Sequence, residues 1–203
     1  MDRHPTLAVC GLGRCGTSMM MQMLHAGGDA CFGDWPDFEP DELRPGADLS
    51  NTWPMLHGTA FKLIDPHRAK PPGRPFIAIL LTRDPANQAL SQWKLLRASF
   101  PMLDPFDRSA RRRWIANLRA SEEKARTWLR RNAGFAIEIT FEEVLAAPRS
   151  VAERLAALPR LPAHNLNVDA MVAAVRPRPS GAMCAPDLAI EAALIREVEN
   201  RHG

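Results

Sequence analysis

The stretch of sequence that decides the fold lies near the N-terminus, at Leu7–Ser18, and reads LAVCGLGRCGTS. Its apolar beginning predicts a buried strand at about Thr6–Cys10, then a loop at Gly11–Gly16 and a helix at about Thr17–Ala26. The backbone N–H groups at the start of such a helix are unpaired and carry the positive end of the helix dipole, and glycines let an anion approach the backbone closely. The stretch therefore predicts a loop that binds phosphate or sulfate.

The spacing of this loop matches the P-loop of nucleoside triphosphatases, G-x-x-x-x-G-K-S/T, except at one position. Thr17 stands where that motif has its lysine, so the charge that grips the β- and γ-phosphates is missing. An ATPase, a GTPase or an ordinary kinase is therefore disfavoured. Arg14 supplies a cation from a different position in the loop. A cysteine phosphatase is excluded, because neither Cys10 nor Cys15 has the arginine that its C-x5-R motif requires.

The rest of the chain alternates between apolar runs of strand type and segments with helical caps or helical spacing. We expect strands at residues 60–64, 76–82 and 135–139, and helices at residues 85–100 and 106–132 and after the capping-box pattern at Thr140–Glu143. Residues 29–53 are expected to be irregular, and the C-terminal residues to form short helices broken at Arg176–Pro179. This alternation favours an α/β fold, a three-layer P-loop fold with a mainly parallel central sheet flanked by helices, in a single domain over residues 1–203.

The loop resembles that of a known family, the sulfotransferases that use 3′-phosphoadenosine 5′-phosphosulfate (PAPS). Their phosphosulfate loop reads approximately Pro or Gly, any residue, Arg or Lys, then Ser-Gly-Thr and Ser or Thr, and Gly11–Ser18 is similar to it. At the end of the expected central strand, Arg83 and Ser91 have the spacing of the family's pair for the 3′-phosphate. Independently, open α/β sheets bind ligands at the carboxyl ends of their strands, where Arg83 is expected. Weaker similarities extend the resemblance from about Leu7 to Arg178, at residues 61–66, 140–148 and 169–175.

The resemblance implies a donor, a reaction and a set of binding residues. The donor is PAPS, which leaves as the 3′,5′-bisphosphorylated nucleotide; the acceptor carries a hydroxyl or an amine, and no metal ion is expected. The residues that the resemblance assigns to donor binding are Gly13, Arg14, Cys15, Gly16, Thr17, Ser18, Arg83 and Ser91, with Arg176 and Arg178 as substitutes for a C-terminal Arg-Lys-Gly segment that this chain lacks.

Arg14, Lys62 and Asp34 are expected to take part in catalysis. Arg14 and the N–H groups of the loop would stabilise the charge that develops on the leaving phosphate. Lys62 would contact the transferring sulfuryl group, or would simply be a strand-end lysine that faces water. A general base is desirable because an acceptor hydroxyl has a pKa far above neutrality, and the resemblance favours a carboxylate after the first helix. The candidates are Asp34 first, Asp37 and Glu39 as alternatives, and His57, Asp65 and His67 as outsiders.

Cys15 departs from the family's pattern, which has a serine at this position. The substitution removes one hydroxyl donor from the loop. A cysteine at a helix N-terminus is also expected to have a lowered pKa and to be open to oxidation. The histidine base that some members carry two residues after a lysine is absent as well, because Ile64 follows Lys62 at that spacing.

The net charge of +3 hides an asymmetry, because residues 1–60 hold three Arg and eight Asp or Glu. Much of the positive surplus lies at Arg108–Arg131, where Trp114, Leu118, Ala125 and Leu129 recur at helical spacing. We interpret this stretch as a helix with a solvated basic face, which also steers anions, and expect no nucleic-acid partner. No apolar run is long enough to span a membrane, no secretory signal is recognised, and four cysteines lack disulfide or zinc spacing, so a cytoplasmic location is expected.

Two other functions stay open beside the sulfotransferase. The first is a small-molecule kinase with a variant P-loop, and the second is a non-catalytic protein of the same fold that binds a nucleotide or a partner. Dependence on Mg²⁺ would favour the kinase, whereas preference for a 3′-phosphorylated nucleotide would favour the sulfotransferase. Binding without turnover would favour the non-catalytic protein.

Overall fold

The computed structural model describes residues 5–100, 102, 106–159 and 166–175. In this part of the chain four strands form one sheet in the order β2-β1-β3-β4, and every neighbouring pair is parallel. The strands are β1 (Leu7–Gly11), β2 (Ala60–Ile64), β3 (Ile77–Thr82) and β4 (Phe135–Thr140). The predicted α/β class with a parallel sheet is confirmed.

The strands β1, β2 and β3 are buried on both faces because their side chains alternate between two apolar layers, whereas the edge strand β4 is largely exposed. In β1, Leu7 and Val9 join one buried cluster, while Ala8 and Cys10 join the other. Parallel strands that are covered on both sides have this continuous apolar composition. Lys62 in β2 is the charged residue of these three strands, and it lies in register with Val9.

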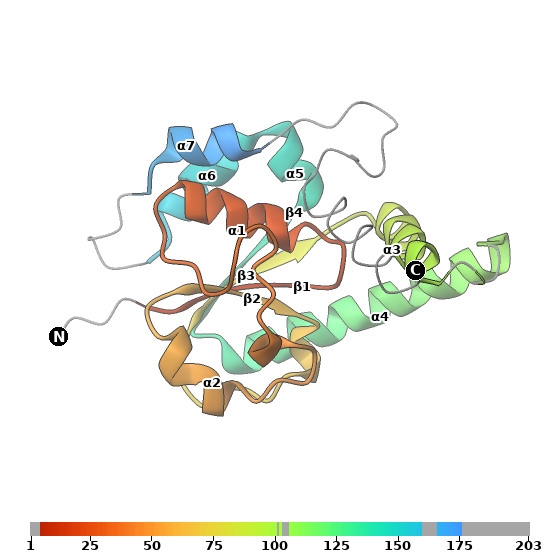
Figure 1. Cartoon of the computed structure of the whole chain (residues 1–203), viewed down its shortest axis with the longest axis horizontal. Helices are drawn as coiled ribbons and strands as arrows, with labels where there is room; N and C mark the ends of the chain where they lie inside the picture. The colour runs from red at the N-terminus through yellow and green to blue at the C-terminus, as the bar shows by residue number, and fades with distance from the viewer. Residues whose placement is uncertain (1–4, 101, 103–105, 160–165, 176–203) are drawn as a thin grey trace, which may run out of the picture.

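Helices cover both faces of the sheet and make the three layers (Figure 1). One face carries α1 (Thr17–Ala26), α5 (Phe141–Ala146), α6 (Pro148–Ala156) and α7 (Val168–Ala174). The other carries α2 (Leu49–Leu56) and α4 (Arg108–Asn132), with α3 (Pro85–Ser99) packed against the N-terminal half of α4. Short 3-10 turns occur at Asp41–Leu43 and Pro66–Arg68. No helix in the described ranges is long and apolar enough to cross a membrane.

Local capping signals explain where several helices begin. The Asp84 carboxylate accepts a hydrogen bond from the N–H of Asn87, and Pro85 occupies the first turn, as expected for this start of α3. Thr140 and Glu143 form the predicted capping box at α5. In α4, Leu118, Ala125 and Leu129 are buried as expected from their spacing.

The expectation for residues 29–53 is wrong in part, because α2 begins inside this segment. The Asp48 carboxylate caps α2 by accepting from the N–H of Ser50, and Trp53 and Leu56 bury the helix against the sheet. The prediction of irregular structure rested on the acidic composition of residues 29–53 and their Pro and Gly content, and the helix even contains Pro54. Burial of the apolar face outweighs that unfavourable local composition. The break expected at residues 176–179 lies outside the described residues.

Candidate active site

The loop after β1 and the residue after β3 meet at the carboxyl edge of the sheet. β1 and β3 are neighbours, and the chain continues from β1 to one side of the sheet and from β3 to the other. Open α/β sheets bind ligands outside the carboxyl ends of strands at such a reversal of strand order. Arg83 directly follows β3 and therefore lies beside this loop.

The carbonyl groups of the loop are held by side chains from α3 and by Arg83. The Gly13 carbonyl accepts hydrogen bonds from Gln88 at 2.9 Å and from Gln92 at 2.7 Å. The Arg14 carbonyl accepts from Nη1 of Arg83 at 3.1 Å. Because the N–H and C=O of a trans peptide point in opposite directions, these contacts turn the N–H of Arg14 away from α3 and the N–H of Cys15 away from Arg83.

Several N–H groups of the loop remain available to an anion. Among the described residues, none accepts from the N–H of Gly13, Gly16 or Ser18, and all three residues are partly exposed. Gly16 has φ +107°, and a Cβ there would lie 2.6 Å from the ring of Phe141. Only glycine fits this position, and as the N-cap of α1 it offers no side chain to cap the helix. The loop thus presents a helix N-terminus of the kind that suits an anion.

Hydrogen bonds join the two sequence motifs directly. Nε of Arg14 donates to Oγ of Ser91 at 3.2 Å, while Arg83 bonds the Arg14 carbonyl and lies 4.3 Å over the ring of Phe141. Ser91 is completely buried, and its hydroxyl accepts this hydrogen bond from the loop arginine. Its contact with the 3′-phosphate stays a prediction. The structure therefore brings Arg14, Arg83 and Ser91 together and makes Ser91 a support for Arg14.

Cys15 faces the core and does not face a ligand. Its side chain is 1% exposed, and its N–H donates to the Leu12 carbonyl at 3.2 Å. Burial raises the pKa of the Cys15 thiol to about 12, although the N–H of Thr17 acts in the opposite direction. The expectation of a lowered pKa is wrong, because loss of water around the thiolate outweighs the field at the start of α1. Thr17 is buried too, so the side chains of Cys15 and Thr17 anchor the loop in the core.

Lys62 lies on the same side of the sheet as α1 and is almost completely buried, at 2% exposed. Its Nζ donates to Oγ of Ser18 at 2.7 Å and to the Asp37 carbonyl at 2.9 Å, and it forms an ion pair with Glu39. These three partners engage all three N–H donors of the Lys62 ammonium group. The alternative that Lys62 faces water is therefore wrong, and its contact with Ser18 places it next to the anion loop.

The carboxylate that reaches Lys62 is Glu39, whereas Asp34 was the first candidate. Asp34 is exposed, and within the described residues its side chain makes no hydrogen bond or ion pair. The Asp37 carboxylate accepts from the N–H of Glu39 at 3.2 Å and so helps to position that residue. Glu39 is half exposed, so its carboxylate also reaches the surface.

The remaining candidates have other surroundings. Asp65 pairs with Arg68 at 3.7 Å, and His57 lies exposed at the end of α2. Burial lowers the pKa of His67, whose Nδ1 is buried and has no hydrogen-bond partner in the described structure. Arg176 and Arg178 lie outside the described residues. Within the described ranges, no group of three or more His, Cys, Asp and Glu side chains is arranged to hold a metal ion.

The sequence did not indicate the residues of α3 and α4 that hold the loop after β1. Gln88 and Gln92 bond the Gly13 carbonyl, and Trp114 of α4 donates its indole N–H to Gln92 at 2.7 Å. The spacing of Gln88, Ser91 and Gln92 is a signal that could have found them, because residues three and four apart share one face of a helix. Phe141 lies in a segment with a weak family resemblance, but its contact with Gly16 depends on the tertiary fold.

No protein-family model matches this chain, and no curated protein sequence matches it. Among solved structures, the fold is similar to that of a sulfotransferase from Alicyclobacillus acidocaldarius. The similarity has a TM-score of 0.47 at 17% sequence identity and covers 97% of this chain and 93% of that chain. The solved protein is a sulfotransferase, the family that residues 11–18 and 83–91 of this chain resemble.

Proposed function

We propose that this protein transfers a sulfuryl group from PAPS to an acceptor that carries a hydroxyl or an amine. The observation that carries the proposal is the junction between the loop and the end of β3. There Arg14 and Arg83 meet beside the available N–H groups of Gly13, Gly16 and Ser18. Cations and N–H groups at the carboxyl edge of a parallel sheet favour a ligand with several negative charges.

The residues of the site fit a nucleotide with a phosphosulfate at one end and a 3′-phosphate at the other. The N–H groups of Gly13, Gly16 and Ser18, together with Lys62, would hold the phosphosulfate end. Arg83 would hold the 3′-phosphate, since it stands at the strand end outside the loop and is partly exposed. Its position over the Phe141 ring restricts the orientation of its guanidinium group.

When bound, PAPS supplies a sulfuryl group attached to a phosphate that can leave. Arg14 would stabilise negative charge at that phosphate, and Ser91 would keep the Arg14 side chain in place through its hydrogen bond. Lys62 would exchange its contact with Glu39 for the anionic group that lies over Ser18, and Nζ would donate to that group. Glu39 would accept the proton of the acceptor hydroxyl on its carboxylate, which already lies against Lys62. We therefore propose Glu39, in place of Asp34, as the general base.

The kinase alternative requires a cation at the position of Thr17, and Thr17 is buried at 3% exposed. The non-catalytic alternative shares the binding site but predicts no turnover. Nucleotide preference therefore separates the kinase from the other two, and release of the sulfuryl group separates the enzyme from the binding protein.

The first test is thermal stabilisation of the protein by adenosine 3′,5′-bisphosphate, compared with ATP plus Mg²⁺. A ligand at a hundred times its dissociation constant stabilises the folded state by about 2.7 kcal/mol. For a chain of this size each kcal/mol raises the melting temperature by roughly 2–4 °C. We expect a shift with the 3′,5′-bisphosphate that is lost in Arg83→Ala and kept in Arg74→Ala. Arg74 is a matched control because it is exposed and forms no contact within the described residues.

A shift with ATP plus Mg²⁺ and none with the 3′,5′-bisphosphate would disprove the proposal in favour of the kinase. If the bisphosphate binds, formation of that nucleotide from PAPS is measured against a panel of phenols, sugars and amines. Binding without turnover across the panel would leave the non-catalytic protein as the better description.

A further inference from the structure

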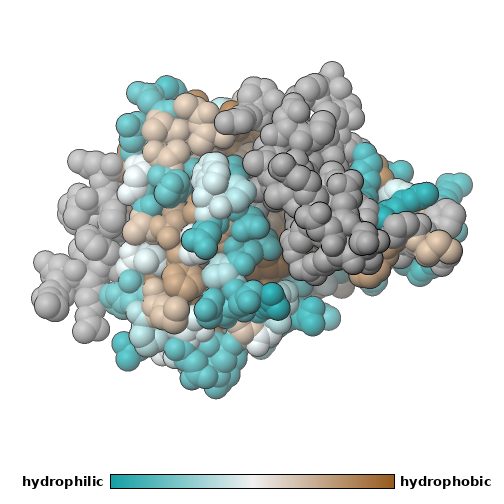
Figure 2. Space-filling view, in the orientation of Figure 1, coloured by the Kyte–Doolittle hydropathy of each residue, from teal (hydrophilic) through white to brown (hydrophobic). Residues whose placement is uncertain are grey.

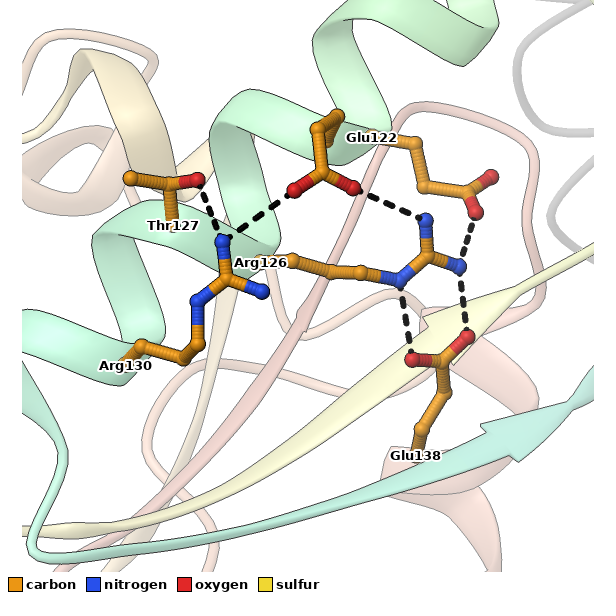
Figure 3. A network of polar contacts seen from close by, with 6 residues as sticks. Glu122, Arg126, Thr127, Arg130 and Glu138 are labelled. Carbon is orange, nitrogen blue, oxygen red and sulfur yellow. Dashed lines mark hydrogen bonds and ion pairs between the residues drawn. The ribbon is translucent and has the colours of Figure 1, made fainter.

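The helix α4 has two halves that differ in their ion pairs. In the C-terminal half, Arg126 pairs with Glu122, Glu123 and Glu138, and Arg130 pairs with Glu123 (Figure 3). The N-terminal half, residues 108–119, contains five arginines and no acidic residue. Within the described residues none of these arginines forms an ion pair, and Arg113 bonds only the hydroxyl of Ser109.

Three of these arginines share one face of the helix. Arg112 and Arg119 follow Arg108 by four and eleven residues, which are whole turns of an α-helix. Arg126 continues the same row one heptad further on, where Glu138 of β4 neutralises it. Arg126 therefore has a carboxylate partner beside the sheet, whereas Arg108, Arg112 and Arg119 have none in the described structure.

The part of the row without carboxylate partners lies beyond the sheet. α4 has 25 residues and β4 has six, which correspond to lengths of about 37 Å and about 20 Å. Residues 133–134 connect the end of α4 directly to β4, so the excess length of the helix extends past the opposite, carboxyl edge of the sheet. Figure 1 shows this projecting end.

Apolar side chains are exposed at the same end. Phe100 is 59% exposed and Met102 is 96% exposed, and both lie in the connection from α3 to α4. The surrounding residues 94–119 contain seven Lys or Arg and two Asp. In Figure 2 the projecting end of α4 carries hydrophilic residues with hydrophobic ones beside them.

We propose that this basic, apolar-tipped end of α3 and α4 binds the surface of an anionic lipid bilayer. Arginines are attracted to anionic headgroups, and exposed Phe and Met side chains gain by leaving water for the acyl boundary. A nucleic acid or an acidic polysaccharide would use the arginines alone and would leave Met102 in water. The proposed surface lies at the same edge of the sheet as the donor loop but uses side chains that do not contact that loop, and the proposal does not depend on the proposed function.

The test measures binding of the full chain to vesicles of phosphatidylcholine with about a quarter phosphatidylglycerol, by co-sedimentation at low and at physiological salt. We expect binding to these vesicles and not to pure phosphatidylcholine. Arg108→Gln, Arg112→Gln and Arg119→Gln together should weaken it on the order of a hundredfold. The triple control Arg74→Gln, Lys124→Gln and Arg131→Gln removes the same charge from other exposed sites and should bind within a few-fold of the wild type.

Phe100→Ser with Met102→Ser should weaken binding roughly tenfold and make the remainder more sensitive to salt. Circular dichroism melts establish that each variant is folded. Equal loss in the two triple variants, or equal binding to neutral vesicles, would overturn the proposal. Tight binding to heparin or to an oligonucleotide with no binding to anionic vesicles would also overturn it, in favour of an anionic polymer.

Discussion

Lys62 and Arg126 each stand at the centre of an ionic cluster, but their partners come from different kinds of structure. The partners of Lys62 are Ser18, at the start of α1, and Asp37 and Glu39, in the segment after α1. The side-chain partners of Arg126 lie on regular elements, with Glu122 on α4 itself and Glu138 on β4 (Figure 3).

The two clusters also differ in how deeply their side chains are buried. The Lys62 side chain is 2% exposed and its partner Glu39 is 54% exposed, whereas Arg126 is 31% exposed. Glu39 can leave Lys62 and be solvated by water, because its own carboxylate already reaches the surface. Arg126 bridges α4 and the edge strand β4 through its contact with Glu138. We infer that the first cluster exchanges partners when a ligand binds, and that the second fastens a helix to the sheet.

The largest effect is expected for Glu39→Gln, which removes the proposed base and keeps the shape of the side chain. Loss of a general base lowers turnover by about 10²–10⁴-fold. Because Glu39 is half exposed, the melting temperature should change little. Sulfuryl transfer from PAPS to the best acceptor of the panel is the measurement, with Asp34→Asn as the control. If Asp34→Asn loses turnover and Glu39→Gln retains it, the base is Asp34.

Lys62→Met tests whether the buried cluster serves binding and catalysis more than stability. Turnover should fall by about 10²–10³-fold, as it does when a donor to the reacting anion is lost. Stability should stay within about 1 kcal/mol of the wild type, because a methionine fills the buried site and Glu39 is solvated by water. Melting temperature and turnover are measured on the same preparation. A large fall in melting temperature would assign Lys62 to the stability of the fold.

Arg126→Met should lower stability and leave nucleotide binding unchanged, the reverse of the effect expected for Lys62→Met. It removes a bidentate contact with Glu138 and leaves Glu122, Glu123 and Glu138 to repel one another, which costs about 1–2 kcal/mol. The melting temperature should therefore fall, while binding of the 3′,5′-bisphosphate stays unchanged. Arg131→Met on the same helix is the control, because Arg131 is exposed and forms no ion pair in the described structure. Weaker nucleotide binding in Arg126→Met would mean that the two clusters are coupled.

Local signals in the sequence were sufficient for most of the regular structure. The helix at Thr17–Ala26 and the strand at Ala60–Ile64 have the predicted bounds, since glycine breaks and apolar runs define both. The capping patterns at Asp84 and Thr140 also hold, because a cap depends on residues within one turn. The meeting of Arg83 with the loop follows from topology, since β1 and β3 pair in parallel and end at one edge.

The features that the sequence did not predict depend on the path of the chain through space. Glu39 reaches Lys62 because Phe38 is buried and residues 34–38 turn back over α1, which no spacing in the sequence indicates. The pKa of Cys15 is raised by burial that only the packed core provides. The residues Gln88 and Gln92 act on a carbonyl more than seventy positions away, so helical spacing gives their common face but not their partner.

The smallest effect is expected from the pH dependence of the surface cluster. The hydrogen bond from Arg126 holds the pKa of Glu138 below its ordinary value of 4.5. A carboxylate with a lowered pKa in the folded state adds stability that is present above its ordinary pKa and is lost as pH falls through the folded value. Glu138→Gln should therefore cost about 0.5–1 kcal/mol near neutral pH, since the group is 42% exposed, and almost nothing at the acid end.

Thermal melts of the wild type and of Glu138→Gln between neutral pH and pH 3 measure this difference. Glu153→Gln is the control, because the Glu153 side chain is exposed on α6 and makes no hydrogen bond or ion pair in the described ranges. The control should differ from the wild type by a small amount that does not change with pH. A constant difference for Glu138→Gln as well would mean that its contact with Arg126 acts through packing and not through charge. The contrast with Lys62 would then rest on burial alone.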